Sequence, residues 1–143
     1  DLKPGNIMIT KSGGVKLADL GIAKQLGNEF GGTMAGTAIG TPYYIAPEQA
    51  EDASSVDHRC DIYSLGATLY HLLTGRVPFR GSNLMEVLLK HRKEPLVSPK
   101  VHRKGLPDNI CNVICKMMEK NIEDRIVKKN KICLGRRECG RKL

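Results

Sequence analysis

The sequence comprises 143 residues, enough for one small domain or part of a larger one, and 41% of them are apolar, as expected of a protein that buries a core. Aromatic residues make up only 4% and tryptophan is absent, which argues against a stacking surface for single-stranded nucleic acid. No apolar run is long enough to cross a membrane, and the start of the chain has no signal-peptide pattern.

The net charge of +8 is concentrated at the end of the chain. Residues 128–143 contain seven Lys or Arg and one Glu, whereas the rest of the chain is nearly balanced. We interpret residues 128–143 as a basic tail that is disordered or aberrant, because no aromatic or helical pattern accompanies its charges. The alternative is a tail that binds nucleic acid through phosphate contacts, but we expect no nucleic-acid partner.

Two short β-prone segments, residues 7–9 and 15–17, lie near the start of the chain. The residues between them, Thr-Lys-Ser-Gly-Gly, are typical of a hairpin loop, so we predict a small antiparallel hairpin. Residues 25–41 follow with five glycines, three threonines and few large apolar side chains. This composition predicts a long loop, and loops of this length are usually functional or disordered.

A helix is predicted from Asp61 to Thr74, because apolar side chains occur on nearly every side of it and Gly75 follows. A second helix is predicted over residues 83–92, where apolar residues and His91 recur at helical spacing. A helix that is apolar all round belongs in the middle of a domain, so we place the first of these at the centre.

Residues 95–107 are rich in Pro, Ser and Lys and are predicted to be a loop. Asp108 is a plausible N-cap for a third helix. Its apolar face follows the i, i+3, i+4, i+7, i+8 pattern and consists of Ile110, Val113, Ile114, Met117 and Met118.

The first six residues, Asp1-Leu2-Lys3-Pro4-Gly5-Asn6, place an aspartate five positions before an asparagine and directly before a β-prone segment. This pattern resembles the catalytic loop of protein kinases, in which the aspartate accepts the proton of a substrate hydroxyl and the asparagine holds a magnesium ion. The spacing matters because one loop must place a base at the nucleophile and an oxygen ligand at the metal. Alone this pattern is a weak signal, because many surface loops contain both residue types.

Two further motifs follow in chain order. Asp19-Leu20-Gly21 comes after the predicted hairpin, where its carboxylate could complete an oxygen site for magnesium with Asn6. Taken alone, this tripeptide would favour the alternative of an ordinary turn after a strand. Ala46-Pro47-Glu48 then ends a segment that contains phosphorylatable threonines. All three motifs in this order leave little room for coincidence.

Together these motifs resemble the serine/threonine protein kinase family over residues 1–127. The amino-acid sequences of Asp1–Ile9 and Gly40–Gln49 are most similar to those of bacterial members. The resemblance implies an α+β fold, a mainly α-helical C-terminal kinase lobe with a small β-hairpin at the catalytic cleft. It implies transfer of the γ-phosphoryl group of ATP to Ser or Thr hydroxyls of protein substrates, with ATP and Mg²⁺ as cofactors. Leu20 departs from the Phe of the family, although another apolar residue can fill that position.

The resemblance also implies roles for individual residues. Asp1 would be the catalytic base, and Lys3 would contact the transferred phosphate. Thr41 would bond to both of these side chains from the substrate-facing segment. Asn6 and Asp19 would hold magnesium and, through it, the nucleotide.

Outside the catalytic set, Asp61 would brace the backbone of the catalytic loop, and Glu48 would form a partly buried ion pair with Arg125. Thr33 and Thr37 lie in the loop between the second and third motifs and are candidate regulatory phosphorylation sites. The alternative is that small hydroxyl residues simply populate a glycine-rich loop.

The glycine-rich phosphate loop, the β3 lysine and the C-helix glutamate of the family do not occur in these 143 residues. We therefore expect a fragment in which the N-terminal lobe is absent and which is inactive alone, because half a site cannot position ATP. A protein serine/threonine kinase is the predicted function. A pseudokinase-like module that binds partner proteins is the alternative, which the complete set of motif residues argues against.

Five cysteines occur without a C-x-x-C pair, which favours reduced, structural cysteines over a zinc site or a disulfide framework. A cytoplasmic location is accordingly predicted, and the sequence leaves open a membrane anchor in a longer parent protein.

Overall fold

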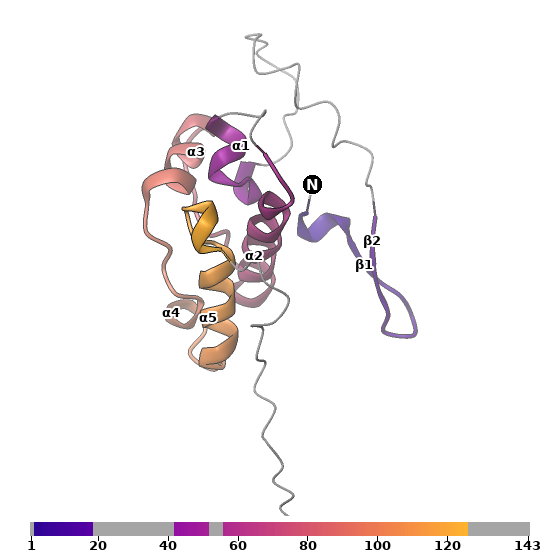
Figure 1. Ribbon diagram of the computed structural model, residues 1–143. Coiled ribbons are helices and arrows are strands. Elements are labelled where there is room, and N and C mark those ends of the chain that lie inside the picture. Colours follow the sequence, from indigo (N-terminus) through magenta and orange to yellow (C-terminus); the bar gives the residue numbers. More distant parts are fainter. Residues whose placement is uncertain (1, 19–41, 52–55, 126–143) are drawn as a thin grey trace, which may run out of the picture.

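The computed structural model describes residues 2–18, 42–51 and 56–125 (Figure 1). Within these ranges the fold is mainly helical with one two-stranded antiparallel sheet, as predicted. No helix in this part of the chain is long and apolar enough to cross a membrane. The elements in chain order are η1 (Pro4–Asn6), β1 (Ile7–Ile9), β2 (Val15–Leu17), η2 (Pro42–Tyr44), α1 (Pro47–Glu51), α2 (Arg59–Thr74), α3 (Leu84–Lys93), α4 (Pro99–His102), α5 (Asp108–Met117) and η4 (Ile122–Asp124), where η denotes a short 3-10 helix.

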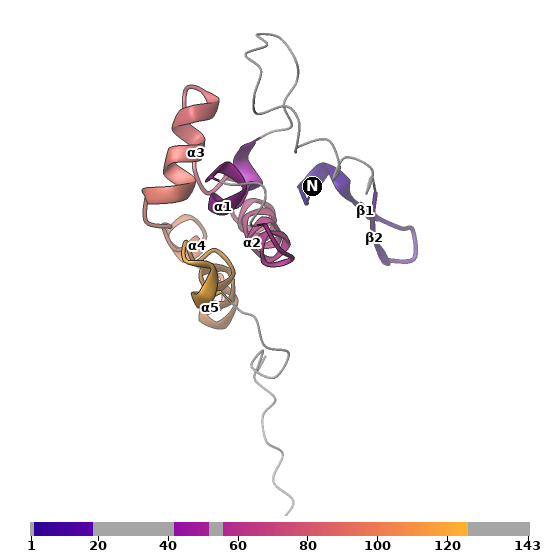
Figure 2. The same cartoon turned by 45° about the horizontal axis from the view of Figure 1, so that its top comes forward.

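The predicted hairpin is confirmed and projects from the helical body (Figures 1 and 2). Its register pairs Ile7 with Leu17, Met8 with Lys16 and Ile9 with Val15. In the connecting loop, Gly13 has a φ of 82°, a left-handed conformation that glycine adopts without strain. The Gly14 N–H donates to Thr10 Oγ1 at 2.9 Å, so the threonine side chain closes the turn.

Helix α2 packs against α5, α4, η2 and η1, and it lies between η1 and α5 (Figure 2). It begins at Arg59, two residues before the predicted start, because the Asp57 carboxylate accepts the Arg59 N–H at 2.8 Å. It ends at Thr74 as predicted, and Gly75 follows with a φ of 70°. Burial is not complete all round, since Leu72 is 52% exposed.

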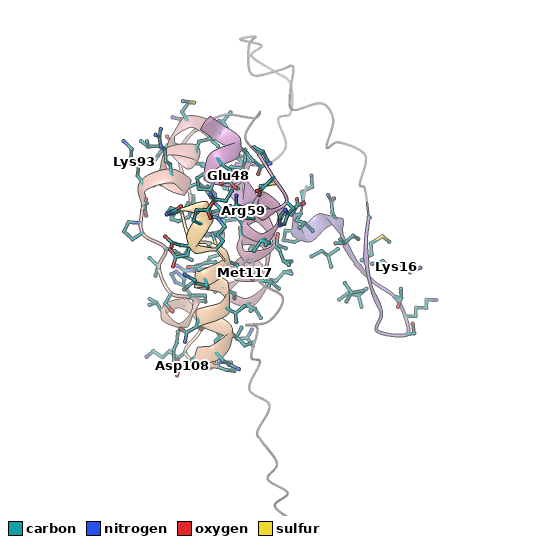
Figure 3. All side chains as sticks on the ribbon, viewed as in Figure 1. Lys16, Glu48, Arg59, Lys93, Asp108 and Met117 are labelled. Atoms are coloured by element: carbon teal, nitrogen blue, oxygen red, sulfur yellow. The ribbon has the colours of Figure 1, made fainter. Side chains whose placement is uncertain are left out.

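The main packing contact of α2 is with α5, and it depends on Gly66. A Cβ at this position would lie 2.8 Å from Met118 Cγ and 2.9 Å from Met117 Cβ, so only glycine lets the two helices approach this closely. Met117 is labelled on α5 in Figure 3. The buried core cluster consists of Tyr44, Ala46, Cys60, Tyr63, Ala67, Tyr70, Phe79, Ile114 and Met118.

Helix α3 matches its prediction closely. Asn83 is the N-cap, and its side chain accepts the Glu86 N–H at 2.9 Å. The predicted apolar face is buried and includes Val87, Leu88 and His91.

Two details differ from the predictions. Asp108 is the first residue of α5 rather than its N-cap, because Pro107 takes the extended N-cap conformation and the Asp108 carboxylate instead pairs with Lys100. The predicted loop 95–107 contains the short helix α4, which Ser98 caps by accepting the Lys100 N–H at 3.4 Å.

Candidate active site

The loop Leu2–Asn6 is folded onto the central helix. The Asn6 N–H donates to the Lys3 carbonyl at 3.0 Å, which closes η1, and Asn6 is only 9% exposed. From α2, Thr68 Oγ1 donates to the Leu2 carbonyl oxygen at 3.0 Å. Because Thr68 is fully buried, this bond fixes the start of the loop to the interior of the helical body.

The hairpin brings the chain back to Asn6. The Ala18 N–H donates to the Asn6 carbonyl oxygen at 2.7 Å, directly after the last paired residue of β2. Asp19 is the next residue in the sequence. The strand pairing therefore places Ala18, the residue before Asp19, beside Asn6.

The remaining predicted residues of the catalytic and regulatory set, Asp1, Asp19, Thr33, Thr37 and Thr41, lie outside the described residues. Within the part that the structure describes, no group of three or more His, Cys, Asp or Glu side chains is placed to hold a metal ion. The Asn6 carboxamide is an oxygen donor of the kind that magnesium takes, so the residue present fits the predicted site.

After residue 41 the chain is anchored on α2. In η2, Tyr44 is buried and its hydroxyl lies 2.8 Å from His71 Nδ1, with the two rings stacked at 6.0 Å between centroids. Ala46 is fully buried, and its N–H donates to Gln49 Oε1 at 3.0 Å at the start of α1. The Ala-Pro-Glu motif is thus a fixed end point for the segment before it.

Glu48 and Arg125 form the ion pair that the resemblance implies. Arg125 Nη1 lies 2.5 Å from Glu48 Oε1 and Nη2 lies 2.7 Å from Oε2, a bidentate geometry. The Arg125 side chain is fully buried, and it also donates to the carbonyl oxygens of Glu119, Arg59 and Lys120. Glu48 and Arg59 accordingly lie at the same end of the helical body (Figure 3).

Asp61 lies in the first turn of α2 with its side chain exposed. Among the described residues it makes no side-chain hydrogen bond to the catalytic loop; Thr68, two turns further along α2, makes that contact instead. A role for Asp61 in bracing the loop therefore stays a prediction.

A second buried polar group joins α2 to α3. His91 is fully buried, and its Nδ1 lies 3.0 Å from the hydroxyl of Tyr63, which is also fully buried. Burial, and then the positive charge of Lys120, lower the pKa of His91 to about 3, so the ring is neutral. Lys120 Nζ donates to the His91 carbonyl oxygen at 2.6 Å and lies 4.0 Å above the ring of Phe79.

Sequence reasoning missed three of these contacts, namely those of Thr68, His71 and His91. A signal exists in each case, because a hydroxyl or imidazole lies among apolar residues on a predicted helix and needs a buried partner. The partners are far away in sequence, 66 residues for Thr68 and 28 for His91, so the pattern alone could not identify them.

Residues 1–133 match the protein kinase domain family. Among curated relatives, the serine/threonine-protein kinase PknB of Mycobacterium tuberculosis (strain H37Rv) is 42% identical over 128 residues, which cover 87% of this chain and 20% of that protein. The PknB of Mycobacterium leprae is 40% identical over 125 residues with the same coverage. A probable serine/threonine-protein kinase of Clostridium perfringens is 40% identical over 127 residues, 87% of this chain and 18% of that protein.

The chain thus spans about a fifth of the length of the curated relatives that it matches. The matched region includes every residue that the sequence analysis assigned to catalysis or to the Glu48–Arg125 pair.

Proposed function

The chain belongs to the protein kinase domain family, and on that premise we propose that it supplies the catalytic and substrate-facing part of a serine/threonine protein kinase. The reaction is transfer of the γ-phosphoryl group of ATP to a Ser or Thr hydroxyl of a protein substrate. In this proposal residues 1–127 are the catalytic unit and residues 128–143 are a basic tail outside it.

The observation that carries this proposal is the hydrogen bond between the Ala18 N–H and the Asn6 carbonyl oxygen. It connects the end of the catalytic loop to the strand that leads directly into Asp19. A phosphoryl-transfer site needs a base, a cation and two oxygen ligands for the metal within one cleft, because catalysis is positioning plus charge stabilisation. The hairpin supports this proximity, because it returns Ala18, the residue before Asp19, to Asn6.

The proposed chemistry assigns one task to each residue. The Asp1 carboxylate takes the proton of the substrate hydroxyl, whose oxygen then bonds to the γ-phosphorus as the bond from that phosphorus to the bridging oxygen breaks and ADP leaves. Lys3 stabilises the charge on the transferred group, and Thr41 holds Asp1 and Lys3 in place. Asn6 and Asp19 hold Mg²⁺, which when bound would offset charge on the phosphates.

The anchoring of residues 42–48 on the helical core supports a substrate-facing role for the segment before them. Tyr44 and the Glu48–Arg125 pair hold residues 42–48 against the helical core. The segment that we propose to contact the substrate peptide is therefore attached to the core at its C-terminal end. Phosphorylation of Thr33 or Thr37 would add charge to that preceding segment, where pairing with basic side chains would order it. The proposal places the reaction in the cytoplasm, where ATP is available.

The test is phosphate incorporation from γ-labelled ATP into a protein acceptor by the intact gene product that carries these residues. We expect phosphoserine or phosphothreonine but no phosphotyrosine, and loss of nearly all incorporation in the Asp1→Asn and Asp19→Ala variants. Asp108→Asn, at an exposed position on α5, is the matched control and should retain full activity. Incorporation that survives Asp19→Ala, or partner binding without any incorporation, would favour the pseudokinase-like alternative.

A further inference from the structure

Thr68 lies in the interior of α2, and its hydroxyl bonds outside its own helix. A threonine inside a helix ordinarily donates back to a carbonyl oxygen one turn earlier. Thr74, at the end of the same helix, does this, since its Oγ1 donates to the Tyr70 carbonyl oxygen at 2.7 Å. Thr68 is fully buried, and its Oγ1 donates instead to the Leu2 carbonyl oxygen at 3.0 Å, 66 residues away in the sequence. The hydroxyl of Thr68 therefore holds a different segment of the chain.

The bonded carbonyl belongs to the peptide unit that joins Leu2 to Lys3. A peptide unit is planar, so the bond from Thr68 fixes the backbone on the N-terminal side of Lys3. On the other side, the following proline restricts Lys3 to extended backbone, with φ −145° and ψ 158°. The Lys3 carbonyl oxygen also accepts the Asn6 N–H at 3.0 Å. The backbone of Lys3 is thus held from both sides.

The other end of the catalytic loop has an anchor of its own. The Ala18 N–H donates to the Asn6 carbonyl oxygen at 2.7 Å, and the strand that follows Asn6 is paired along its length with β2. Neither contact involves α2. Loss of the Thr68 hydroxyl should therefore release the peptide unit before Lys3 and leave the Asn6 carbonyl bonded to Ala18.

We propose that Thr68 is a positioning residue for phosphoryl transfer, which sets the backbone at Lys3 through the Leu2 carbonyl oxygen. This inference rests on the proposed kinase function, in which Lys3 stabilises the charge on the transferred group. Thr68 does not touch the reacting atoms. Its effect on the rate arises because a charge-stabilising group must be held in position, and a misplacement of about 1 Å can cost about 100-fold. The catalytic loop thus has two separate anchors, Thr68 for Lys3 and the hairpin for Asn6.

The two anchors can be separated by kinetics on the intact gene product. Thr68→Val keeps the shape of the side chain but removes the donor. We expect kcat to fall about 10-fold, while KM for the protein substrate and the magnesium concentration for half-maximal rate stay unchanged. Thr68→Ser keeps the hydroxyl and should restore kcat to near the wild-type value. Thr68→Cys keeps only a weak donor, so its kcat should lie between those of the Ser and Val variants.

Two controls separate positioning from general loss of stability. Thr74→Val is the same substitution on the same helix, but the bonds that it removes lie at the helix end. Ile114→Val removes a methyl group from a buried side chain on α5 and should destabilise the fold through packing. Both variants should retain the wild-type kcat at a temperature at which they are folded.

A further measurement needs no activity. Hydrogen exchange at residues 2–6 should be faster in Thr68→Val than in the wild-type protein, whereas exchange of the Ala18 N–H should be unchanged. Faster exchange at Ala18 as well would mean that the loop has one anchor rather than two, and would overturn the proposal.

The kinetic outcomes distinguish this proposal from the proposed function. Absence of phosphate transfer by the wild-type protein would overturn the proposed function and with it the catalytic role of Thr68. Wild-type activity with an unchanged kcat in Thr68→Val, or an equal loss in the Val and Ser variants, would overturn the Thr68 proposal alone. A raised magnesium requirement in Thr68→Val would do the same. Should Thr68→Val fail to fold, the Cys and Ser variants decide, since equal kcat values in these two would overturn the proposal.

Discussion

Glu48 and Arg125 are joined by two hydrogen bonds of 2.5 and 2.7 Å although 77 residues separate them in the sequence. The guanidinium also lies 4.9 Å from the ring centroid of Tyr63 and has no exposed side-chain surface. The pair therefore links the Ala-Pro-Glu motif to the turn after α5, beside Tyr63 of α2.

Removal of the Arg125 guanidinium should leave the Glu48 carboxylate largely buried without its partner. We expect Arg125→Met to lower the free energy of unfolding by about 3–5 kcal/mol, measured by urea denaturation. Arg125→Lys should cost less but still be destabilising, because an ammonium cannot make the bidentate contact. In a double-mutant cycle with Glu48→Gln the two losses should be far from additive; additive losses would mean that the pair is not coupled.

The bond from Thr68 to the Leu2 carbonyl should hold the catalytic loop in place. Thr68→Val keeps the shape of the side chain but removes the donor, so we expect a loss of about 1–2 kcal/mol in stability. Hydrogen exchange at residues 2–6 should become faster. Thr74→Val is the matched control, because the bonds of Thr74 Oγ1 to the described residues lie near its own helix end, at Tyr70 and Arg76. Equal exchange at residues 2–6 in both variants would contradict the assignment.

The contact of α2 with α5 should not tolerate a methyl group at position 66. Alanine is intrinsically better than glycine in a helix by about 1 kcal/mol, but the added Cβ would overlap two methionine side chains. Overpacking of this kind costs about 1–3 kcal/mol, so Gly66→Ala should lower the melting temperature. Gly105→Ala, where a Cβ meets nothing within 4 Å, should not. A Gly66→Ala protein with a raised melting temperature would refute the close approach.

The buried His91 should make stability depend on pH. Its pKa is about 3 in the folded protein, against 6.5 for an unperturbed histidine, so below pH 6.5 the unfolded chain binds the extra proton. The free energy of unfolding should thus fall as the pH is lowered from 6.5 toward 3, by up to about 1.4 kcal/mol per pH unit. Urea denaturation at pH 7 and at about pH 5 measures this. The dependence should be weaker in His91→Gln and unchanged in His102→Gln; equal dependence in all three proteins would contradict the burial of His91.

The hairpin and the three longer helices were predictable from the sequence because their signals are local. Alternating short β-prone runs around a Gly-Gly loop defined β1 and β2, and Asn83 was correctly included at the start of α3. The helix α4 was missed because four residues are too few to show a period. Asp108 was misplaced by one position because the proline before it can also adopt the N-cap conformation.

Contacts between distant segments were predictable only where the family resemblance supplied them. The Glu48–Arg125 pair was expected on that ground and is present. The bond from Thr68 to Leu2 joins a helix interior to a loop, and nothing in either local pattern selects the partner. His91 was placed correctly on a buried helix face, but its hydrogen bond to Tyr63 follows from packing of α2 on α3, which no periodicity encodes.

The most direct test of the account is the magnesium dependence of phosphoryl transfer in Asn6→Ala. The central claim is that the Asn6 carboxamide, beside the strand end that leads to Asp19, is a ligand of the cation that carries ATP. Loss of one ligand should raise the magnesium concentration for half-maximal rate at least about 10-fold, with KM for the protein substrate unchanged. An unchanged magnesium requirement in this variant would contradict the claim.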